Sequence, residues 1–405
     1  MDVIYADNNA TTCIAPEVRD AMMPFLTTEY FNPSSMYEQA SKASAAVSRA
    51  RDDVAAMIGT ADSHQVVFTS GATESNNTAL CGAVKANRKR RHIVTTAVEH
   101  PAVLGVCKDL ERNGVEVTFL PVDREGCIDT GDFVRALRPD TLLVSIMHAN
   151  NETGVIFPIG EFARVTKETD PAILFHTDAT QTAGKMPLDL DGELKHIDLL
   201  SLSGHKFHAP KGVGALFMRR GCRVRPYLVG GHQEDGRRAG TENVPYIAAL
   251  GRACRLAVET YEEEGRVRVL RDRLESAILD RVPYVEINGR GAPRLPNTLN
   301  LACHFVEGEG ILYQLSAEGI CVSSGSACTS GSLDPSHVLK AMHAPFTAIH
   351  GSVRFSLSRY TTDSEVERIT EVFPQVIHNL RRLSPYWDMK HDRPRENAPA
   401  TTPTA

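Results

Sequence analysis

The sequence lacks the cysteine spacing that marks a disulfide framework or a structural metal site. Its nine cysteines are spread singly over 405 residues, with no CxxC pair and no regular interval between them. Disulfide-rich domains and zinc sites depend on paired, closely spaced thiols. The spacing therefore argues against a disulfide framework and against a structural zinc site, and we expect most of these cysteines to be reduced and half-buried.

The sequence also lacks long apolar runs and a continuous basic stripe. No apolar run approaches the length of a membrane span, and the start MDVIYADNNATT has neither the basic nor the apolar region of a secretion signal. The net charge is -6, with basic and acidic residues interspersed, and we interpret RKRR (88–91) as a solvated helix end. We expect a cytoplasmic protein that binds neither membrane nor nucleic acid.

Apolar, strand-like runs alternate with amphipathic helical stretches through the first part of the chain. The runs lie at 65–70, 92–97, 115–120, 141–147, 172–178, 197–202 and 212–218. Helices are expected at 38–58, ending at Gly59, and at 101–113, opening with Pro101. This alternation predicts an α/β domain built on a mostly parallel sheet with helices on its faces.

The chain after about residue 245 has a different pattern. A long charged helical stretch (246–281) precedes short strands near 284–287, 297–302 and 351–357 and helices near 308–318 and 363–382. We expect a large domain over 15–255, a smaller α+β domain over 256–390 and a disordered tail over 391–405. The tail is rich in Pro, Thr and Ala and has almost nothing apolar to bury.

Lys206 stands directly after a strand-like run, in SGHK (203–206), and a second such run follows it. Ligand chemistry in α/β proteins gathers at strand ends of this kind. A lysine there is a candidate to form a Schiff base with an aldehyde. The alternative is a solvated loop lysine, which is the usual role of an arbitrary lysine.

Other strand ends carry polar groups that suit the same ligand. They are the glycine turn of TSGATESN (69–76) with Thr73, then His100, then Asn150 and Asn151, then Asp178 and Gln181. The turn precedes a helix whose first N–H groups can hold a phosphate. Each group alone is explicable as a cap or turn residue. Together, a lysine, a carboxylate, an imidazole and a phosphate turn are the parts that hold pyridoxal phosphate.

Ordered motifs then make the resemblance specific. They include NNATT (8–12), GATES (71–75), VEHPAV (98–103), NNETG (150–154), DATQ (178–181), SGHK (203–206), RRAGTEN (237–243) and SSGSACTSGS (323–332). From YADNNATT to about SPYW (384–387) the chain resembles the cysteine desulfurases of NifS/IscS type, fold-type-I pyridoxal phosphate enzymes of the class-V aminotransferase family. Flanking details resemble the nitrogen-fixation branch more closely.

The resemblance implies a fold and a set of residue roles. The fold has a seven-stranded, mostly parallel sheet, a smaller α+β domain with which residues 1–14 associate, and a homodimeric assembly. The cofactor would be held by Lys206, Asp178 at the pyridine nitrogen, Gln181 at the ring oxygen, His100 stacked on the ring, Asn151, and, at the phosphate, Ala72, Thr73, Ser203, His205 and Thr241 of the partner subunit.

Substrate handling is implied in the same way. Asn151 and Arg354 would orient L-cysteine, and Arg354 is the better candidate for its carboxylate because a guanidinium binds a carboxylate through two parallel hydrogen bonds. Lys206 would move the substrate α-proton, and His100 would donate or accept protons. The nearby Lys211 is assigned a structural or surface role.

Cys328 lies in a run of small residues that predicts a mobile, exposed loop. The resemblance makes Cys328 the thiol that takes the substrate sulfur as a persulfide, leaves L-alanine, and passes the sulfur to an acceptor. A NifU-type iron–sulfur scaffold is the expected acceptor, in nitrogenase maturation. A transient iron–sulfur cluster at Cys328 is also considered. Cys321 is expected to be a strand thiol, and a resolving role for it stays open.

Other functions remain open at this stage. On the same scaffold they are housekeeping cluster assembly, a selenocysteine lyase and an aminotransferase, although transamination has no need of Cys328. A different class is a non-enzymatic sulfur or iron–sulfur carrier, which the scattered cysteines disfavour.

Overall fold

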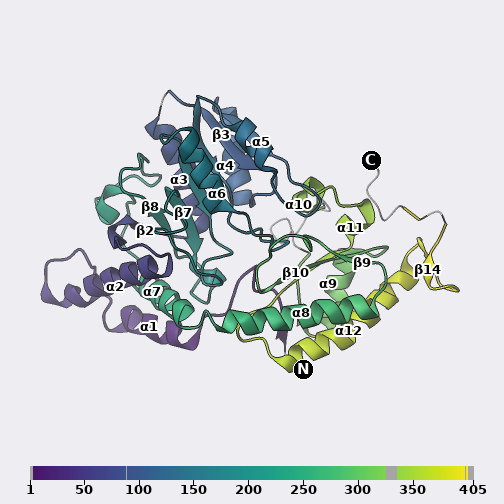
Figure 1. Cartoon of the computed structure of the whole chain (residues 1–405). Helices are drawn as coiled ribbons and strands as arrows, with labels where there is room; N and C mark the ends of the chain where they lie inside the picture. The colour runs from purple at the N-terminus through teal and green to yellow at the C-terminus, as the bar shows by residue number, and fades with distance from the viewer. Residues whose placement is uncertain (1–2, 88, 325–334, 397, 400–405) are drawn as a thin grey trace.

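The computed structural model of the chain describes residues 3–87, 89–324, 335–396 and 398–399 (Figure 1). A large sheet with helices on both faces occupies one side of the molecule, and a smaller sheet with its own helices occupies the other. No helix within the described ranges is both long and apolar enough to cross a membrane.

The large sheet has seven strands in the order β2-β8-β7-β6-β5-β3-β4. They are β2 Val66–Thr69, β3 His92–Thr96, β4 Glu116–Leu120, β5 Thr141–Ser145, β6 Leu174–Asp178, β7 Leu199–Ser203 and β8 Gly214–Met218. Only β8 runs antiparallel to its neighbours, β2 and β7. The expected seven-stranded, mostly parallel sheet is confirmed. Helices cover both of its faces, which explains why the strands read as continuous apolar runs.

Helices form a layer on each face of this sheet. α3 (Ala72–Ala86) and α4 (Pro101–Arg112) pack in one apolar cluster with Val67 and Leu199. The opposite cluster contains the neighbouring residue Leu200. On that face lie α1 (Pro16–Thr27), α2 (Ser41–Met57), α5 (Thr130–Ala136), α6 (Ile159–Thr169) and α7 (Val244–Glu259). Successive strand residues thus fill opposite layers, as the period of a β-strand requires.

The smaller part is built on a three-stranded antiparallel sheet. Its elements are β9 Val285–Ile287, β10 Thr298–Cys303, β12 Ser352–Ser356, α8 Glu263–Arg281, α9 Gly308–Ala317 and α12 Asp363–Leu383. The short helices α10 His337–Ala341 and α11 Phe346–His350 precede β12 in the chain and contribute Val338, Leu339 and Ala348 to the apolar cluster of the large sheet. β10 is the central strand. Near the N-terminus, β1 (Ile4–Tyr5) pairs in parallel with β11 (Ile320–Cys321). The N-terminal segment thus reaches the small part before it crosses to the large one.

Two expectations from the sequence need correction. The helix expected over 246–281 is two helices, because α7 ends at Glu259 and α8 begins at Glu263. α7 packs in the core of the large sheet and α8 in the core of the small one, so the chain bends where it passes between them. Part of the expected disordered tail is folded, because β13 (Trp387–Asp388) pairs with β14 (Arg393–Pro394) and Trp387 is buried.

Candidate active site

A cavity of about 520 Å³ lies where the parallel strands of the large sheet end. It brings together most of the site residues expected from sequence: Ala72, Thr73, His100, Asn151, Asp178, Gln181, Ser203, His205, Lys206 and Arg354. Lys211 also lines it. Thr241 is instead exposed and lines a neighbouring hollow with Ser70 and Gly212. Cys328 lies outside the described residues.

The turn from β2 into α3 forms one end of the cavity. Gly71, the N-cap of α3, has a φ of +148°, a conformation that residues with a side chain rarely adopt. Glycine has no side chain with which to cap α3, so the first N–H groups of the helix suit an anion such as a phosphate. Ser203, at the end of β7, approaches the same turn, since a Cβ on Gly71 would lie 3.4 Å from the Ser203 Oγ.

Glu74 brings a carboxylate into this first turn, but the charge is paired. Its side chain accepts hydrogen bonds from Arg238 Nε at 2.9 Å and from the Ser70 N–H at 2.8 Å. Burial alone would raise the pKa of Glu74, yet the hydrogen bonds from Arg238 and Ser70 bring it below its ordinary value. The pair also ties the segment that carries Thr241 to the anion-binding end of α3.

Asp178 is the last residue of β6 and is buried. Its Oδ2 accepts a hydrogen bond of 2.7 Å from Asn76 Nδ2, and its Oδ1 accepts one of 3.0 Å from the Thr180 N–H. Both oxygens are therefore held as acceptors by donors from α3 and from the following turn. The sequence did not single out Asn76, which lies one turn along α3 from the predicted phosphate site.

His100 follows β3 and is the N-cap of α4. Its Nδ1 accepts a hydrogen bond of 3.1 Å from the Ala102 N–H, so the proton of the neutral ring lies on Nε2. Burial lowers the pKa of His100, the charges of Lys206 and His337 lower it further, and Asp178 opposes them. The site thus holds a neutral imidazole with a defined tautomer.

Lys206 ends the short helical turn Gly204–Lys206 that follows β7. Its Nζ donates to the carbonyl oxygens of Asn9 and Ala10, at 2.7 and 2.8 Å. The N-terminal segment thus forms the wall that Lys206 faces. The neighbouring His205 makes a 3.1 Å contact from Nδ1 to Thr11 Oγ1, and burial, followed by the charges of nearby lysines, lowers its pKa to about 4.

Arg354 enters the cavity from β12 of the small sheet, with its side chain almost fully buried. It donates from Nη2 to Asp7 Oδ1 at 2.7 Å and from Nη1 to the Asn151 carbonyl at 2.9 Å. Its backbone exchanges hydrogen bonds with Ser323. Arg354 lines the cavity, and it also contacts the N-terminal segment through Asp7 and the chain after β11 through Ser323.

Two buried titratable groups of the site were missed in the sequence. Lys185 donates from Nζ to Gln181 Oε1 at 3.0 Å, and burial followed by the charge of Lys206 lowers its pKa to about 7. The spacing Q-x-x-x-K was the available signal, since residues four apart come together when the chain turns on itself, as it does here between Gln181 and Lys185. Glu99 is fully buried beside His100, and burial raises its pKa to about 8.

The residues present fit pyridoxal phosphate. A buried carboxylate, a helix N-terminus without a side-chain cap, a lysine and a neutral imidazole line one cavity, and the cavity is of the size that small ligands occupy. Among the described residues no group of three His, Cys, Asp or Glu side chains could hold a metal ion. The eight described cysteines are free thiols.

Comparisons with known proteins agree with this chemistry. The family model described as aminotransferase class-V matches residues 4–369. A cysteine desulfurase of Trichormus azollae is 53% identical over 390 residues, covering 95% of this chain and 96% of that protein. Cysteine desulfurase NifS of Azotobacter vinelandii is 50% identical over 385 residues, covering 95% of each chain.

A solved structure of a NifS-like protein superposes with a TM-score of 0.87 at 36% identity, covering 93% of this chain and 100% of that one. Sequence and structure comparisons therefore lead to the same family over nearly the whole length. The chain belongs to the aminotransferase class-V family, and within it to the pyridoxal-phosphate-dependent cysteine desulfurases.

Proposed function

We propose that this enzyme converts L-cysteine to L-alanine, holds the sulfur as a persulfide on Cys328, and passes it to an acceptor protein. The observation that carries the proposal is the backbone pairing of Arg354 with Ser323. It joins the candidate carboxylate-binding residue to the chain five residues before Cys328. Five residues span at most about 17 Å, and this short tether supports a role for the Cys328 thiol at the cavity.

The cofactor would be held by the residues gathered at the cavity. Lys206 would carry it, Asp178 would pair with the pyridine nitrogen, Gln181 would donate to the ring oxygen and His100 would stack on the ring. Its phosphate would be bound by Ala72, Thr73, Ser203, His205 and Thr241 of the partner subunit in a homodimer. When bound, pyridoxal phosphate withdraws electrons from the α-carbon of the substrate.

Residues of the chain would bind the substrate, move its protons and take its sulfur. Arg354 and Asn151 would orient the substrate carboxylate, and Lys206 would take the α-proton. Nε2 of His100 carries a proton in the neutral tautomer, which suits a proton donor. The Cys328 thiolate would then attack the substrate sulfur. The S–S bond forms as the C–S bond breaks, and the electron pair of that bond stays with carbon, which is protonated to alanine.

The direct test is incubation of the purified holoenzyme with L-cysteine. Alanine is quantified, and the persulfide is trapped with an alkylating reagent and located by mass spectrometry. We expect the adduct on Cys328, and loss of sulfur transfer in Cys328→Ala. Cys321→Ala is the matched control, because Cys321 lies seven residues away in β11 and should leave the adduct intact. Alanine formation at the wild-type rate in Cys328→Ala would contradict the proposal.

The acceptor is proposed to be a NifU-type iron–sulfur scaffold that serves nitrogenase maturation. Its support is the relative named NifS and the match of flanking motifs in the sequence. Transfer of labelled sulfur from the Cys328 persulfide to such a scaffold, compared with a general scaffold protein, tests it. Equal transfer to both would favour housekeeping cluster assembly. A higher kcat/KM with selenocysteine than with cysteine would favour the lyase alternative.

A further inference from the structure

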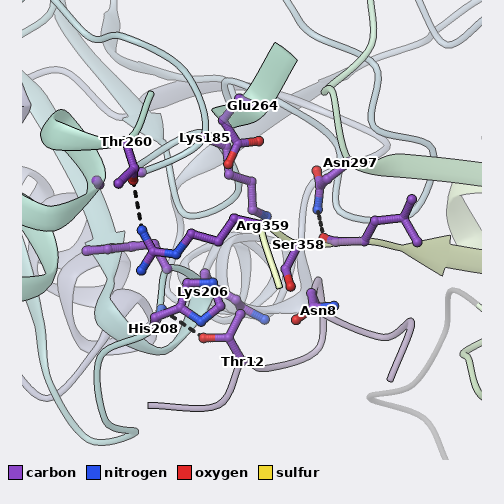
Figure 2. A pocket seen from close by; sticks show the side chains of 14 residues that line it. Asn8, Thr12, Lys185, Lys206, His208, Thr260, Glu264, Asn297, Ser358 and Arg359 are labelled. Carbon is purple, nitrogen blue, oxygen red and sulfur yellow. Dashed lines mark hydrogen bonds between the residues drawn. The ribbon is translucent and has the colours of Figure 1, made fainter. Parts of the chain in front are cut away.

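Lys185 is a buried side chain that lines a second, smaller pocket next to the large cavity. This small pocket is also lined by Lys206, Glu264 and Arg359, and Figure 2 shows these side chains converging there. Lys206 lines both the small pocket and the large cavity. Lys185 is therefore a neighbour of the reacting lysine, although it does not line the large cavity.

The contacts of Lys185 join two side-chain amides. Its Nζ donates to Gln181 Oε1 at 3.0 Å and to Asn9 Oδ1 at 3.1 Å. Nitrogen and oxygen of an amide can exchange places by a flip, but an ammonium group has donors only. The amide atoms that face Lys185 must therefore be the oxygens.

Fixing the oxygens also fixes the amide nitrogens. Gln181 Nε2 then donates to the Asn9 carbonyl at 3.1 Å, on the side of the large cavity that Gln181 lines. The same carbonyl accepts the 2.7 Å hydrogen bond from Lys206 Nζ. Lys185, as donor to the oxygen, and the Asn9 carbonyl, as acceptor from the nitrogen, thus set together which end of the Gln181 amide is which, and Lys185 also holds the segment that Lys206 contacts.

The backbone keeps Lys185 in this place. Gly184 has a φ of +77°, and a Cβ there would lie 2.5 Å from the Cβ of Phe207. The turn from Gln181 to Lys185 therefore packs directly on the residue after Lys206. Asn297 Nδ2 also donates to Asn9 Oδ1, at 3.0 Å, so Asn9 has a second restraint, whereas Gln181 Oε1 is held by Lys185.

We propose that Lys185 is a positioning residue that orients the Gln181 amide, so that its N–H group, and not its oxygen, faces the ring oxygen of the cofactor. The inference rests on the cofactor contact proposed for Gln181. The orientation is set by the ammonium form of Lys185, which has donors only; a neutral amine would also have a lone pair that could accept from an amide N–H.

The test uses Lys185→Met, which keeps the length of the side chain and removes its donors. Without them, the Asn9 carbonyl alone restrains the Gln181 amide, so its N–H group is held less firmly toward the ring oxygen and negative charge there is less well stabilised. We expect the pH midpoint of the visible absorption band of the bound cofactor to rise by about one unit. We expect kcat to fall about tenfold while KM for L-cysteine changes little.

A double-mutant cycle separates orientation from general destabilisation. Gln181→Ala alone should shift the midpoint similarly, and adding Lys185→Met should shift it no further, since no amide remains to be oriented. Lys195→Met is the matched control, because Lys195 is an exposed lysine and should leave the band unchanged. Lys185→Gln, which is too short to reach both amides, gives a second variant in case the methionine variant does not fold.

Two results would overturn the proposal. One is a Lys185 variant with a lower melting temperature and an unchanged band midpoint, which indicates a structural role alone. The other is additive shifts in the double mutant, which indicate that Lys185 acts without Gln181. The band is measured without cysteine, so a failure of the proposed desulfuration leaves this test intact.

Discussion

Asn76 donates a 2.7 Å hydrogen bond from Nδ2 to Oδ2 of Asp178. The two residues are 102 positions apart in the chain, and both are buried. α3 thereby contributes twice to the site, through its N-terminus at the anion-binding turn and through Asn76 behind the carboxylate. The bond restrains the carboxylate that we propose pairs with the pyridine nitrogen of the cofactor.

Asn76→Ala should weaken catalysis without removing the cofactor. A hydrogen bond to a charged group contributes roughly 1.5–3 kcal/mol, so we expect kcat to fall by about ten- to a hundredfold. Steady-state kinetics of alanine formation and the cofactor absorption spectrum measure both effects. Asn77→Ala is the control on the same helix, because Asn77 donates to the Thr73 carbonyl of its own helix. Equal loss in both variants would show that the helix, and not the bond, matters.

Arg354→Lys should separate substrate binding from cofactor binding. Lysine retains the charge but cannot make two parallel hydrogen bonds to a carboxylate. We expect KM for L-cysteine to rise at least about tenfold, with little change in the cofactor band. Titration of the band with cysteine measures the affinity directly. Arg368→Lys, at an exposed ion pair on α12, is the control. An unchanged KM would show that Arg354 does not bind the substrate carboxylate.

Asp7→Asn tests the residue that holds Arg354. The Asp7 carboxylate accepts the 2.7 Å hydrogen bond from Arg354 Nη2, and an asparagine oxygen can accept the same bond without the charge. The Arg354 side chain should therefore stay oriented, while the negative charge of residue 7 that faces the guanidinium is lost. We expect a change in KM smaller than in Arg354→Lys, measured in the same titration. A larger change would show that Asp7 contacts the substrate itself.

Thr241 should act on the cofactor of the partner subunit, because in its own chain it lies outside the cavity. Thr241→Asp places a negative charge beside the phosphate and should lower cofactor affinity strongly. Mixing it with Lys206→Ala tests the arrangement, since each mixed dimer then contains one intact site. About a quarter of wild-type activity should return after subunit exchange. If Thr241 served its own chain, the mixture would stay inactive.

Strand ends could be predicted from the sequence because they depend on local patterns. Apolar runs bounded by turns located the strands, and parallel strands bring their carboxyl ends to one edge, which placed His100, Asp178 and Lys206 together. Asn9 and Lys185 could not be found this way. Their contact joins residues 176 positions apart, through an N-terminal segment that crosses from the small sheet to the large one.

The break at Thr260 was missed for a related reason. The charged, helical pattern continues through 246–281, so local periodicity favours one helix. Two separate apolar cores, one for α7 and one for α8, impose the bend. Propensity decides where a helix can form, whereas tertiary packing decides where it must end.

Glu99 should make the stability of the protein depend on pH. Burial raises its folded-state pKa to about 8 from an ordinary 4.5, the charge of Asp178 adds to this, and hydrogen bonds from the Met147 N–H and Thr96 oppose it. Because the folded-state pKa lies above the unfolded one, the stabilisation is fully present below pH 4.5 and is lost as the pH rises through 8.

The contribution of Glu99 to the free energy of unfolding should therefore fall between these values, by up to about 1.4 kcal/mol per pH unit. Glu99→Gln keeps the shape and the acceptor for the Met147 N–H but does not titrate. Urea unfolding of the holoenzyme at fixed protein concentration, from pH 5 to 8.5, should give a flatter curve of unfolding free energy against pH for this variant. Glu111→Gln, on the exposed side of α4, should retain the wild-type slope. Identical slopes for wild type and Glu99→Gln would mean that Glu99 is already ionised in the folded protein.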